Sequence, residues 1–534
     1  MASPTSDRCL HAGFLDQLAQ RPDATCLELG GRERSYADFG SEAQALAGAL
    51  CSLGEAAPAR VGVWSARGEV GFLGILSSLF SGAAFVPLNP SFPRERTRTM
   101  LEIADVDAIV AEDTNLDVLL AALETLPRPP ALLLPRNEPS GLPAGLPQGS
   151  LGPSELERFS APPRELSVLR EDATAYILFT SGSTGQPKGV PITHANVRNY
   201  LEANQERYAI TSDDRHSMTC DFTFDHCIFD TFMAWNAGAR VCPLGTMDQL
   251  TAPRFVDRNG ITVWFAVPSL IALLERSRQL KPGCMPSLRW SLFAGEALPL
   301  ASAEAWVAAA PSSTLENLYG PTELAVDVTS YRFDPERSPS ECTNGTVPVG
   351  LPYPNMHVLL LDEHGRAADE GLACFAGPQT FPGYWRNRAK TSEAMFDAPD
   401  LHGTQRRWYR TGDRLRRLPS GNLIYLGRAD SQVQVLGSRV ELGEVEAALR
   451  SCAGVTMGAV VPWPVTDLVA EGLVAFVTGE GLSPEALAAS LRERLPPFCL
   501  PRRVMVLDAL PLNANGKIDR PALTAQLAAE HPKR

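Results

Sequence analysis

Short apolar segments alternate with helix-like segments over most of the first 350 residues. Residues 60–66, 83–88 and 107–113 are apolar runs of a length typical of buried strands. Residues 95–103, between two of these runs, have the spacing of a helix. This alternation predicts an α/β architecture of parallel sheets covered by helices. Residues 126–163 are rich in proline, glycine and serine, and we expect a long surface loop there.

A second, smaller unit is expected towards the C-terminus. Its predicted elements are a strand at 432–437, an amphipathic helix at 441–452, strands at 474–479 and 502–511, and a helix at 485–494. An α+β unit of about a hundred residues is within the usual size range of a domain. We therefore predict a large N-terminal domain, residues 1–429, and a small α+β C-terminal domain, residues 430–534.

Composition and charge narrow the class of protein. The 534 residues are too many for one hydrophobic core, and the net charge of −13 argues against nucleic acid as a partner. Eleven cysteines without a CxxC pair indicate reduced thiols in a cytoplasmic protein. The N-terminus lacks the apolar core of a signal peptide. The uncharged run 70–88 is interrupted by glycine, serine and proline, so it predicts a buried helix and strand rather than a membrane span.

The strongest chemical signal is a glycine- and hydroxyl-rich loop after an apolar strand. Within YILFTSGSTGQPKGVPITH, residues 176–194, positions 180–189 contain three glycines, four hydroxyl side chains and one lysine. Glycines let backbone N–H groups approach an anion, and lysine adds a positive charge suited to phosphate. The segment does not fit the Walker A pattern, because Pro187 precedes Lys188 and Gly189 follows it. A flexible surface loop is the alternative to a phosphate loop. The expected phosphate ligands are Thr180, Ser181, Gly182, Ser183, Thr184, Gly185 and Lys188.

The loop TSGSTGQPKG resembles the phosphate loop of the adenylate-forming (ANL) superfamily, which includes acyl-CoA synthetases, luciferases and amino-acid adenylation domains. Further segments that resemble this superfamily follow in order: FDHCIFD (224–230), FAGEALP (293–299), NLYGPTE (317–323), GPQTFPGYW (377–385), YRTGD (409–413), GRADSQVQVLGSRVELGEVE (427–446) and LPLNANGKIDR (510–520). One such motif can arise by chance, but an ordered set along most of the chain does not. The chain is most similar to stand-alone amino-acid adenylation domains of nonribosomal peptide synthetase type. The resemblance implies a C-terminal lid that hinges at Asp430.

Adenylation joins a carboxylate to the α-phosphate of ATP, a reaction that needs positioning and charge neutralisation. The resemblance implies these ligands of ATP and Mg²⁺: Tyr319 against adenine, Asn317 at its exocyclic amine, Asp413 at the ribose, Arg428 at the hinge edge of the nucleotide, Thr322 at the α-phosphate and Glu323 on Mg²⁺. It also implies that Lys517 bridges the substrate carboxylate and the phosphate, and leaves the site when the lid rotates. The residues expected to be catalytic are thus Lys517, Lys188, Thr322 and Glu323. Without the resemblance, Lys517 is an ordinary loop lysine and Asp413 a turn residue.

Asp225 indicates that the substrate is an amino acid. In FDHCIFD it lies where amino-acid-activating relatives carry the aspartate that pairs with the substrate ammonium, a charge that needs a partner when buried. A turn or helix-capping aspartate is the alternative. The other pocket residues implied by the resemblance are His226, Phe229, Phe265, Leu292, Ala294, Leu318, Val326 and Asp327. The two phenylalanines and the two leucines among them indicate a shallow cavity. Asp327 leaves two interpretations open, a second polar contact with the substrate or a pairing with His226.

The predicted function is ATP-dependent adenylation of an amino acid, followed by transfer of the aminoacyl group to the phosphopantetheine thiol of a separate carrier protein. Two departures from the family pattern affect the transfer step: Gln434 replaces a usual lysine and Leu436 a common arginine on the lid. Little chain follows Arg520, so we expect the acceptor to be a different protein. The alternatives are an acyl- or aryl-CoA synthetase of the same fold and a non-catalytic nucleotide-binding homologue.

Overall fold

Six strands form the first sheet of the computed structural model, which describes residues 9–136, 143, 145–159, 170–182, 186–512 and 518–530. The strand order is β6-β5-β3-β4-β7-β8, and all neighbours are parallel except the antiparallel pair β7 and β8. The strands are β3 (Arg60–Trp64), β4 (Ala84–Leu88), β5 (Ala108–Ala111), β6 (Ala131–Leu133), β7 (Thr174–Thr180) and β8 (Lys188–Thr193). The helices of this region are α2 (Tyr36–Ser52), α3 (Glu69–Phe80), α4 (Arg94–Ala104), α5 (Leu116–Leu123) and α6 (Pro153–Leu156).

The second sheet has nine strands, with parallel strands at its centre and antiparallel strands at its edges. In sheet order they are β15 (Leu351–Pro352), β14 (Thr329–Arg332), β13 (Thr314–Tyr319), β12 (Trp290–Phe293), β11 (Val263–Ala266), β9 (Arg215–Met218), β10 (Arg240–Pro243), β1 (Thr25–Leu29) and β2 (Arg32–Ser35). The accompanying helices are α1 (Ala12–Gln20), α7 (His194–Tyr208), α8 (His226–Ile228), the π-helix η2 (Phe229–Met233), α9 (Ala234–Ala237), α10 (Thr246–Leu250), α11 (Ala252–Asn259), α12 (Pro268–Arg276) and α13 (Leu300–Ala309).

A single apolar cluster joins these two sheets. It contains Val63 of β3, Phe72 of α3 and Phe265 of β11. Val70 to Phe80 of α3 are all buried, which confirms the buried helix expected in the uncharged run 70–88. In the described part of the chain, no helix combines the length and the apolar character needed to cross a bilayer.

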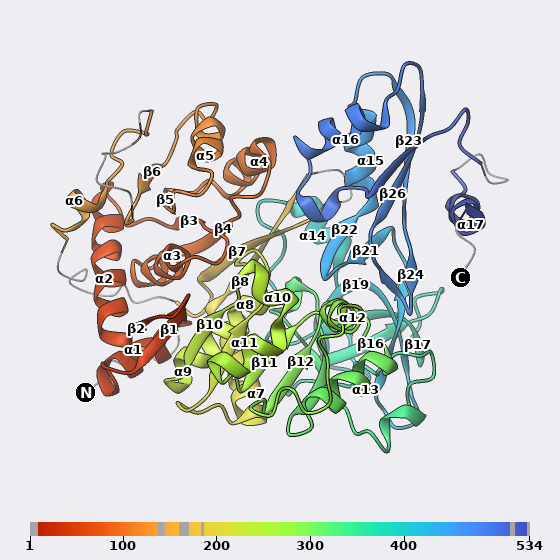
Figure 1. Cartoon of the computed structure of the whole chain (residues 1–534), viewed down its shortest axis with the longest axis horizontal. Helices are drawn as coiled ribbons and strands as arrows, with labels where there is room; N and C mark the ends of the chain where they lie inside the picture. Colours follow the sequence, from red (N-terminus) through yellow and green to blue (C-terminus); the bar gives the residue numbers. More distant parts are fainter. Residues whose placement is uncertain are drawn as a thin grey trace.

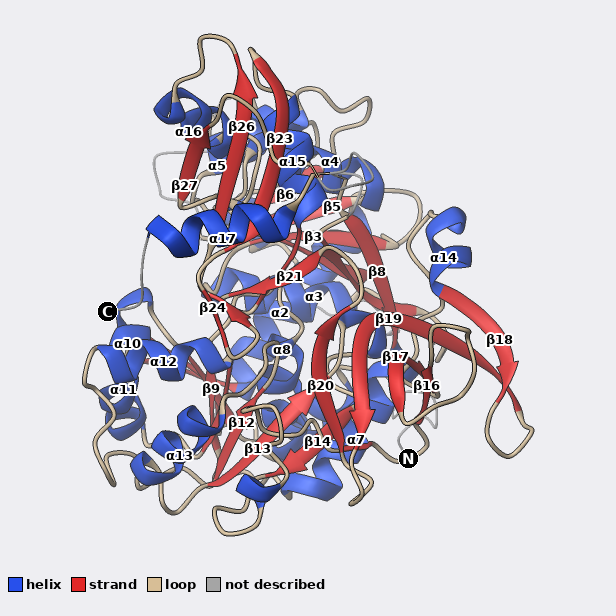
Figure 2. Ribbon diagram, turned by 90° about the vertical axis from the view of Figure 1, so that its right-hand side faces the viewer, coloured by secondary structure: helices blue, strands red, loops and turns tan. Residues whose placement is uncertain are grey.

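A third sheet follows, with antiparallel strands throughout. Its strands are β16 (His357–Leu361), β17 (Glu370–Ala376), β18 (Met395–Pro399), β19 (Gln405–Arg417) and β20 (Leu423–Arg428), and α14 (Arg388–Ala394) precedes β18. Figure 2 shows this sheet as a separate unit beside the other two. Its longest strand, β19, contains six arginines, whereas β16 and β17 are mostly apolar.

The C-terminal lid contains two small sheets. One has the order β22-β21-β25-β24 and the other β23-β26-β27. The elements are β21 (Gln432–Val435), β22 (Ser438–Glu441), α15 (Leu442–Arg450), β23 (Val455–Pro462), β24 (Val465–Thr466), β25 (Val469–Ala470), β26 (Leu473–Gly479), α16 (Pro484–Arg492), β27 (Arg503–Val506) and α17 (Arg520–Glu530). Figure 1 shows the lid, in blue, at the upper right, beside the first sheet and above the second.

The predicted fold class is confirmed: a large N-terminal part with parallel, helix-covered sheets and a small α+β C-terminal part. The elements predicted in the lid are present within a few residues of their expected bounds. The long surface loop predicted at residues 126–163 was partly wrong, because β6 and α6 lie within it. A three-residue strand of alanine and leucine is too short to stand out from its proline-rich surroundings.

Candidate active site

A cavity of about 330 Å³ lies where the lid hairpin β21–β22 meets the carboxyl ends of β7 and β13. Predicted site residues that border it are Thr180, Ser181, Asp225, His226, Leu318, Tyr319, Thr322, Asp413, Arg428 and Asp430. They come from segments that lie far apart in the sequence. The fold therefore brings the predicted phosphate loop, ribose ligand and substrate aspartate around one space.

The phosphate loop connects the antiparallel strands β7 and β8, and Lys188 pairs in register with Thr180. Gly182 is required, because a Cβ atom there would lie 1.9 Å from the carbonyl oxygen of Gln186. The Nζ atom of Lys188 lies 3.6 Å from Oε1 of Glu441 in the lid. Burial, and then the charge of Arg439, lowers the pKa of Lys188. Ser183, Thr184 and Gly185 lie outside the described residues.

Glu323 is fully buried on the turn η3 (Thr322–Leu324), beside the phosphate loop. Its Oε1 accepts a hydrogen bond from the hydroxyl of Tyr384 at 2.8 Å, and its Oε2 accepts one from Nη1 of Arg439 at 3.0 Å. Burial opposes ionisation, but the charges of Arg439 and Lys188 lower the pKa of Glu323 to about 2. Glu323 is therefore ionised at neutral pH.

This single carboxylate fits Mg²⁺. In the described part of the chain, no three His, Cys, Asp or Glu side chains form a ready-made metal cage. Magnesium does not need one, since it usually binds through one or two carboxylates together with waters and substrate phosphates. Glu323, next to the phosphate loop, supplies that kind of ligand.

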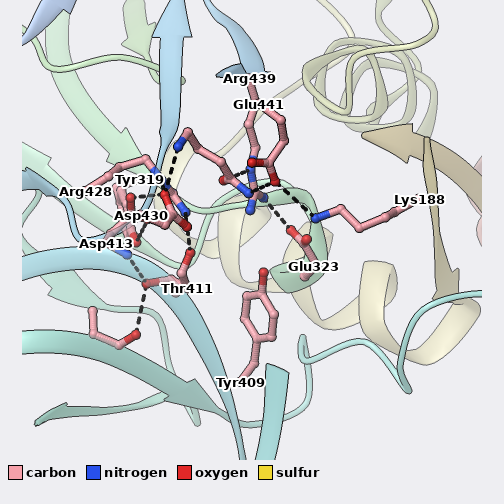
Figure 3. Close-up of polar contacts among 12 residues, drawn as sticks. Lys188, Tyr319, Glu323, Tyr409, Thr411, Asp413, Arg428, Asp430, Arg439 and Glu441 are labelled. Atoms are coloured by element: carbon pink, nitrogen blue, oxygen red, sulfur yellow. Dashed lines mark hydrogen bonds and ion pairs between the residues drawn. The ribbon is translucent and has the colours of Figure 1, made fainter. Parts of the chain in front are cut away.

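Asp413, Arg428 and Asp430 form a chain of ion pairs on another side of the cavity (Figure 3). Nη1 of Arg428 donates to Asp413 at 2.7 Å, and Nε and Nη2 donate to the two oxygens of Asp430, each at 2.7 Å. The hydroxyl of Tyr319 donates to the other oxygen of Asp413 at 2.6 Å. The predicted ribose ligand, nucleotide-edge arginine and hinge residue are thus in direct contact with one another.

Asn317 on β13 does not border the cavity itself, but the next residue, Leu318, does. Its amide nitrogen donates to the carbonyl oxygens of Val347, at 3.1 Å, and Pro348, at 2.9 Å. Its Oδ1 is buried and, among the described residues, has no hydrogen-bond partner. A buried acceptor of this kind is the complement of an exocyclic amine.

Asp225 lies at the start of α8 and borders the cavity. Burial raises the pKa of Asp225 to about 7, and the charge of Glu323 adds to this effect, while a hydrogen bond with the Thr322 side chain opposes it. No arginine or lysine in the described part of the chain forms an ion pair with it. Asp225 is thus a buried carboxylate that faces the cavity without a protein cation.

Only three of the nine predicted substrate-pocket residues border the cavity: Asp225, His226 and Leu318. The other six are almost wholly buried behind them: Phe229, Phe265, Leu292, Ala294, Val326 and Asp327. The imidazole of His226 is stacked on the ring of Phe265, with centroids 4.3 Å apart and an interplanar angle of 17°. The His226 ring therefore separates the cavity from the apolar residues behind it.

Asp327 has a hydrogen-bond partner that was not anticipated, Tyr200. The Tyr200 hydroxyl donates to Oδ2 of Asp327 at 3.1 Å, whereas Oδ1 has no partner among the described residues. Burial, and then the charge of Asp225, raises the pKa of Asp327 well above its usual range. Burial thus favours the neutral form of the Asp327 carboxyl group.

The turn before Asp327 has an unusual backbone. Ala325 and Val326 both have positive φ angles, 56° and 79°, and this region is strongly unfavourable for a β-branched residue. The side chain of Gln379 holds the turn, because its Nε2 donates to the carbonyl oxygens of Leu324, at 3.0 Å, and Asp327, at 2.7 Å. Gln379 lies in GPQTFPGYW, one of the motifs recognised in the sequence, but the contacts of this side chain were not predicted.

The lid makes several polar contacts that sequence reasoning missed, and Figure 3 shows those of Arg439 and Glu441. Ser181 Oγ donates to the carbonyl oxygen of Arg439 at 2.8 Å, and the backbone N–H of Gly437 donates to Glu296 at 2.6 Å. Arg96 on α4 forms a buried ion pair with Glu444 on α15. Most of these residues lie in the motifs GSRVELGEVE and FAGEALP, so the sequence identified the residues but did not predict which of them pair. Lys517 lies outside the described residues.

The two departures in the lid differ in position. Gln434 borders the cavity, and its Oε1 is buried with no hydrogen-bond partner among the described residues. Leu436 is at the hairpin turn, with φ of 49° and half of its surface exposed. Only Gln434 therefore reaches the site itself.

Comparison with known proteins identifies the family. A model described as "AMP-binding enzyme" matches residues 14–385, and one described as "AMP-binding enzyme C-terminal domain" matches residues 444–517. Enterobactin synthase component F of Escherichia coli (strain K12) is 32% identical over 545 residues, covering 98% of this chain and 40% of that protein. The chain thus spans less than half of the length of this curated relative, and a smaller share still of others that it matches.

Two solved structures match along nearly the whole chain. The crystal structure of IdnL7 is 41% identical with a TM-score of 0.71, covering 98% of this chain and 100% of that one. The Vibrio cholerae adenylation domain AlmE, in complex with glycyl-adenosine-5'-phosphate, is 28% identical with a TM-score of 0.85, covering 97% of this chain and 98% of that one. The resemblance to adenylation domains is confirmed, and the chain belongs to the AMP-binding enzyme family, within the adenylate-forming superfamily.

Proposed function

We propose that this chain uses ATP to adenylate an amino acid and then passes the aminoacyl group to the phosphopantetheine thiol of a separate carrier protein. The observation that carries this proposal is Asp225, a buried carboxylate that borders the cavity with no ion-pair partner among the described residues. Leaving a carboxylate buried without a partner is costly, whereas a substrate ammonium both pairs with it and favours its ionised form. The bound glycyl-adenosine-5'-phosphate in the AlmE structure supports the same class of substrate.

The nucleotide ligands in this proposal are those around the cavity. Tyr319 provides a ring for adenine, and Asp413 is held in place for the ribose by Tyr319 and Arg428. Lys188 and the hydroxyls of the phosphate loop neutralise the phosphates, and Thr322, which contacts Asp225, is the ligand for the α-phosphate. Glu323 would hold Mg²⁺, which supplies charge neutralisation on the phosphate oxygens when bound.

The lid is proposed to serve the two half-reactions in two positions, rotating at Asp430 between domains 1–429 and 430–534. In the position observed, Glu441 contacts Lys188 and Arg439 contacts Glu323, so the hairpin covers the phosphate-binding side of the site. We assign this position to aminoacyl transfer. Lys517 is proposed to enter the site in the other position and to bridge the substrate carboxylate and α-phosphate during adenylation. In the transfer step the thiol loses its proton and its sulfur bonds to the acyl carbon, while the bond from that carbon to the phosphate oxygen breaks and AMP leaves.

Pyrophosphate exchange over a panel of amino acids, including β- and D-forms, tests the first half-reaction. The same carboxylic acids without the amino group are the matched controls. Exchange that requires an amino group supports the proposal. Turnover of a simple carboxylic acid with free CoA would instead identify a CoA synthetase, and no exchange with any acid would identify a non-catalytic homologue. Transfer to purified phosphopantetheinylated carrier proteins then tests the second half-reaction.

A further inference from the structure

We propose that His226, stacked on Phe265, closes the side-chain pocket, so that the enzyme selects amino acids whose side chain is no larger than a methyl group. This inference rests on the proposed function, because it assumes that the substrate ammonium pairs with Asp225. It adds the size of the substrate and the residue that sets it. The assignment follows from where the cavity ends and from what lies behind its wall.

On the side of the predicted substrate pocket, the cavity is bordered by Asp225, His226 and Leu318. With the ammonium at Asp225 and the carboxylate directed towards Thr322, the substituent on the α-carbon faces a wall formed by the side chains of His226 and Leu318 together with Gly295 and Gly320. His226 lies flat on Phe265 with ring centroids 4.3 Å apart, a separation at which two near-parallel rings are in van der Waals contact. No substrate atom fits between them.

The layer behind His226 is filled. Phe265 contacts Phe229 edge to face at 5.3 Å, and Phe229 in turn contacts Tyr200 at 6.4 Å. Phe229 and Phe265 have no exposed surface. A branched or aromatic substrate side chain would have to displace these rings, and overpacking a filled core is destabilising.

Gly295 lies beside the edge of the His226 ring. Gly295 has φ of 86°, and a Cβ atom there would lie 3.5 Å from Cε1 of His226. Phe265 thus holds one face of the ring, and Gly295 lines the cavity beside its edge. Burial lowers the pKa of His226 to about 4, so the wall is a neutral imidazole that does not compete with the substrate for Asp225.

The same packing separates Asp327 from the substrate. Asp327 does not border the cavity, and Phe229 is in ring contact with Tyr200, the residue that donates to Asp327. Its carboxyl group therefore supports the ring layer from behind instead of contacting the substrate. Its conversion to asparagine should leave the order of preference among amino acids unchanged.

The wild-type enzyme gives the first test, by pyrophosphate exchange with glycine, alanine, valine, leucine and phenylalanine. Glycine or alanine should have the highest kcat/KM, and each added methylene beyond alanine should lower it by about 10–200-fold. Binding of alanyl and leucyl sulfamoyl-adenosine to the wild type should show the same order. A wild type that uses leucine or phenylalanine as well as alanine overturns the inference.

Two substitutions test the role of the ring itself. His226→Ala should lower the alanine-to-leucine ratio of kcat/KM at least tenfold, because it removes the wall. His226→Phe keeps a flat ring on Phe265 and should retain the wild-type ratio. An unchanged ratio in a folded His226→Ala enzyme, checked by its melting temperature, contradicts the inference. Absence of exchange with every amino acid, or exchange with propionate as good as with alanine, is a different result, because it overturns the proposed function.

Discussion

Replacement of Asp225 with asparagine tests the charge that defines the proposed substrate class. Asparagine keeps the size of the side chain and an acceptor for Thr322, but it removes the negative charge. Loss of one partner of a buried charge pair costs about 2–5 kcal/mol, which corresponds to a fall in kcat/KM for the amino acid of about thirtyfold to several thousandfold. The KM for ATP should change little, since the proposed ribose ligand Asp413 is held by Tyr319 and Arg428 and not by Asp225.

The pH dependence gives an independent readout of the same charge. Burial raises the pKa of Asp225 to about 7, so an ammonium must displace a proton from it below that pH. The KM for the amino acid should therefore fall as the pH rises to about 7 and level off above it in the wild type. In Asp225→Asn the KM should be high and nearly independent of pH over the same range.

At pH 8 the Asp225→Asn substitution should raise the free energy of unfolding, although it lowers activity. An increase in pKa from 3.8 to about 7 in the folded protein costs about 4 kcal/mol of stability once the group ionises. This cost is absent below the unfolded pKa of 3.8, grows as the pH rises, and is complete above about 7. Asp225→Asn should thus be more stable than the wild type at pH 8 and equal to it near pH 4, as measured by urea unfolding.

A matched control separates this effect from the loss of any buried carboxylate. Asp221 is a half-buried carboxylate near the site, but it accepts hydrogen bonds from Asn89 and Thr223 and does not border the cavity. Asp221→Asn should therefore leave the pH profile of KM unchanged. If Asp225→Asn keeps the wild-type kcat/KM, or if both variants lose the pH dependence together, the assignment of Asp225 to the ammonium is wrong.

Three further predictions concern the lid and the residues behind the pocket. Glu441→Gln should slow transfer to the carrier about tenfold and leave pyrophosphate exchange unchanged, because Glu441 contacts Lys188 only when the lid hairpin is in the observed position. Glu485→Gln, at an exposed position, is the control. Equal losses in both assays would refute the assignment. Lys517→Ala should slow adenylate formation about 10²–10³-fold and affect transfer less, whereas Asp430→Pro should do the reverse because proline fixes a backbone angle at the hinge; single-turnover assays of each half-reaction distinguish these outcomes. Asp327→Leu should weaken all amino acids alike; a shift in their ranking in the exchange panel would show that Asp327 contacts the substrate.

The fold was predictable where burial alone determines an element. The strands β3, β4 and β5 are short, apolar and fully or almost fully buried, so the sequence pattern is unambiguous there. The strand β19 is different, because six of its thirteen residues are arginine. Its charged side chains are accommodated by partners on other strands, as in the pair of Arg414 with Glu370 of β17. A strand stabilised in this way has no local signature, since its partners are distant in the sequence.

In the site, too, the sequence identified residues in local motifs but did not predict the contacts between distant residues. The motifs located the phosphate loop, Glu323, Asp413 and Asp225, because each motif is local. The turn at Ala325 and Val326 and its clamp by Gln379 depend on backbone angles and on a contact across the fold, which no local pattern records. The size of the substrate pocket also depends on packing. Two phenylalanines and two leucines indicated a shallow pocket, but the closing ring is His226, which is stacked on Phe265.

The lid hairpin shows why charge, and not shape alone, connects the two half-reactions in the proposed mechanism. Lys188 and Glu323 are buried charges of opposite sign, and a buried charge without a partner is costly. The hairpin places Glu441 against Lys188 and Arg439 against Glu323. It also joins distant segments of the chain, since Ser181, which donates to the carbonyl oxygen of Arg439, is 258 positions away from it. Phosphate and Mg²⁺ would compete with Glu441 and Arg439 for these same two residues. In the proposed mechanism, the lid would therefore take this position after pyrophosphate has left.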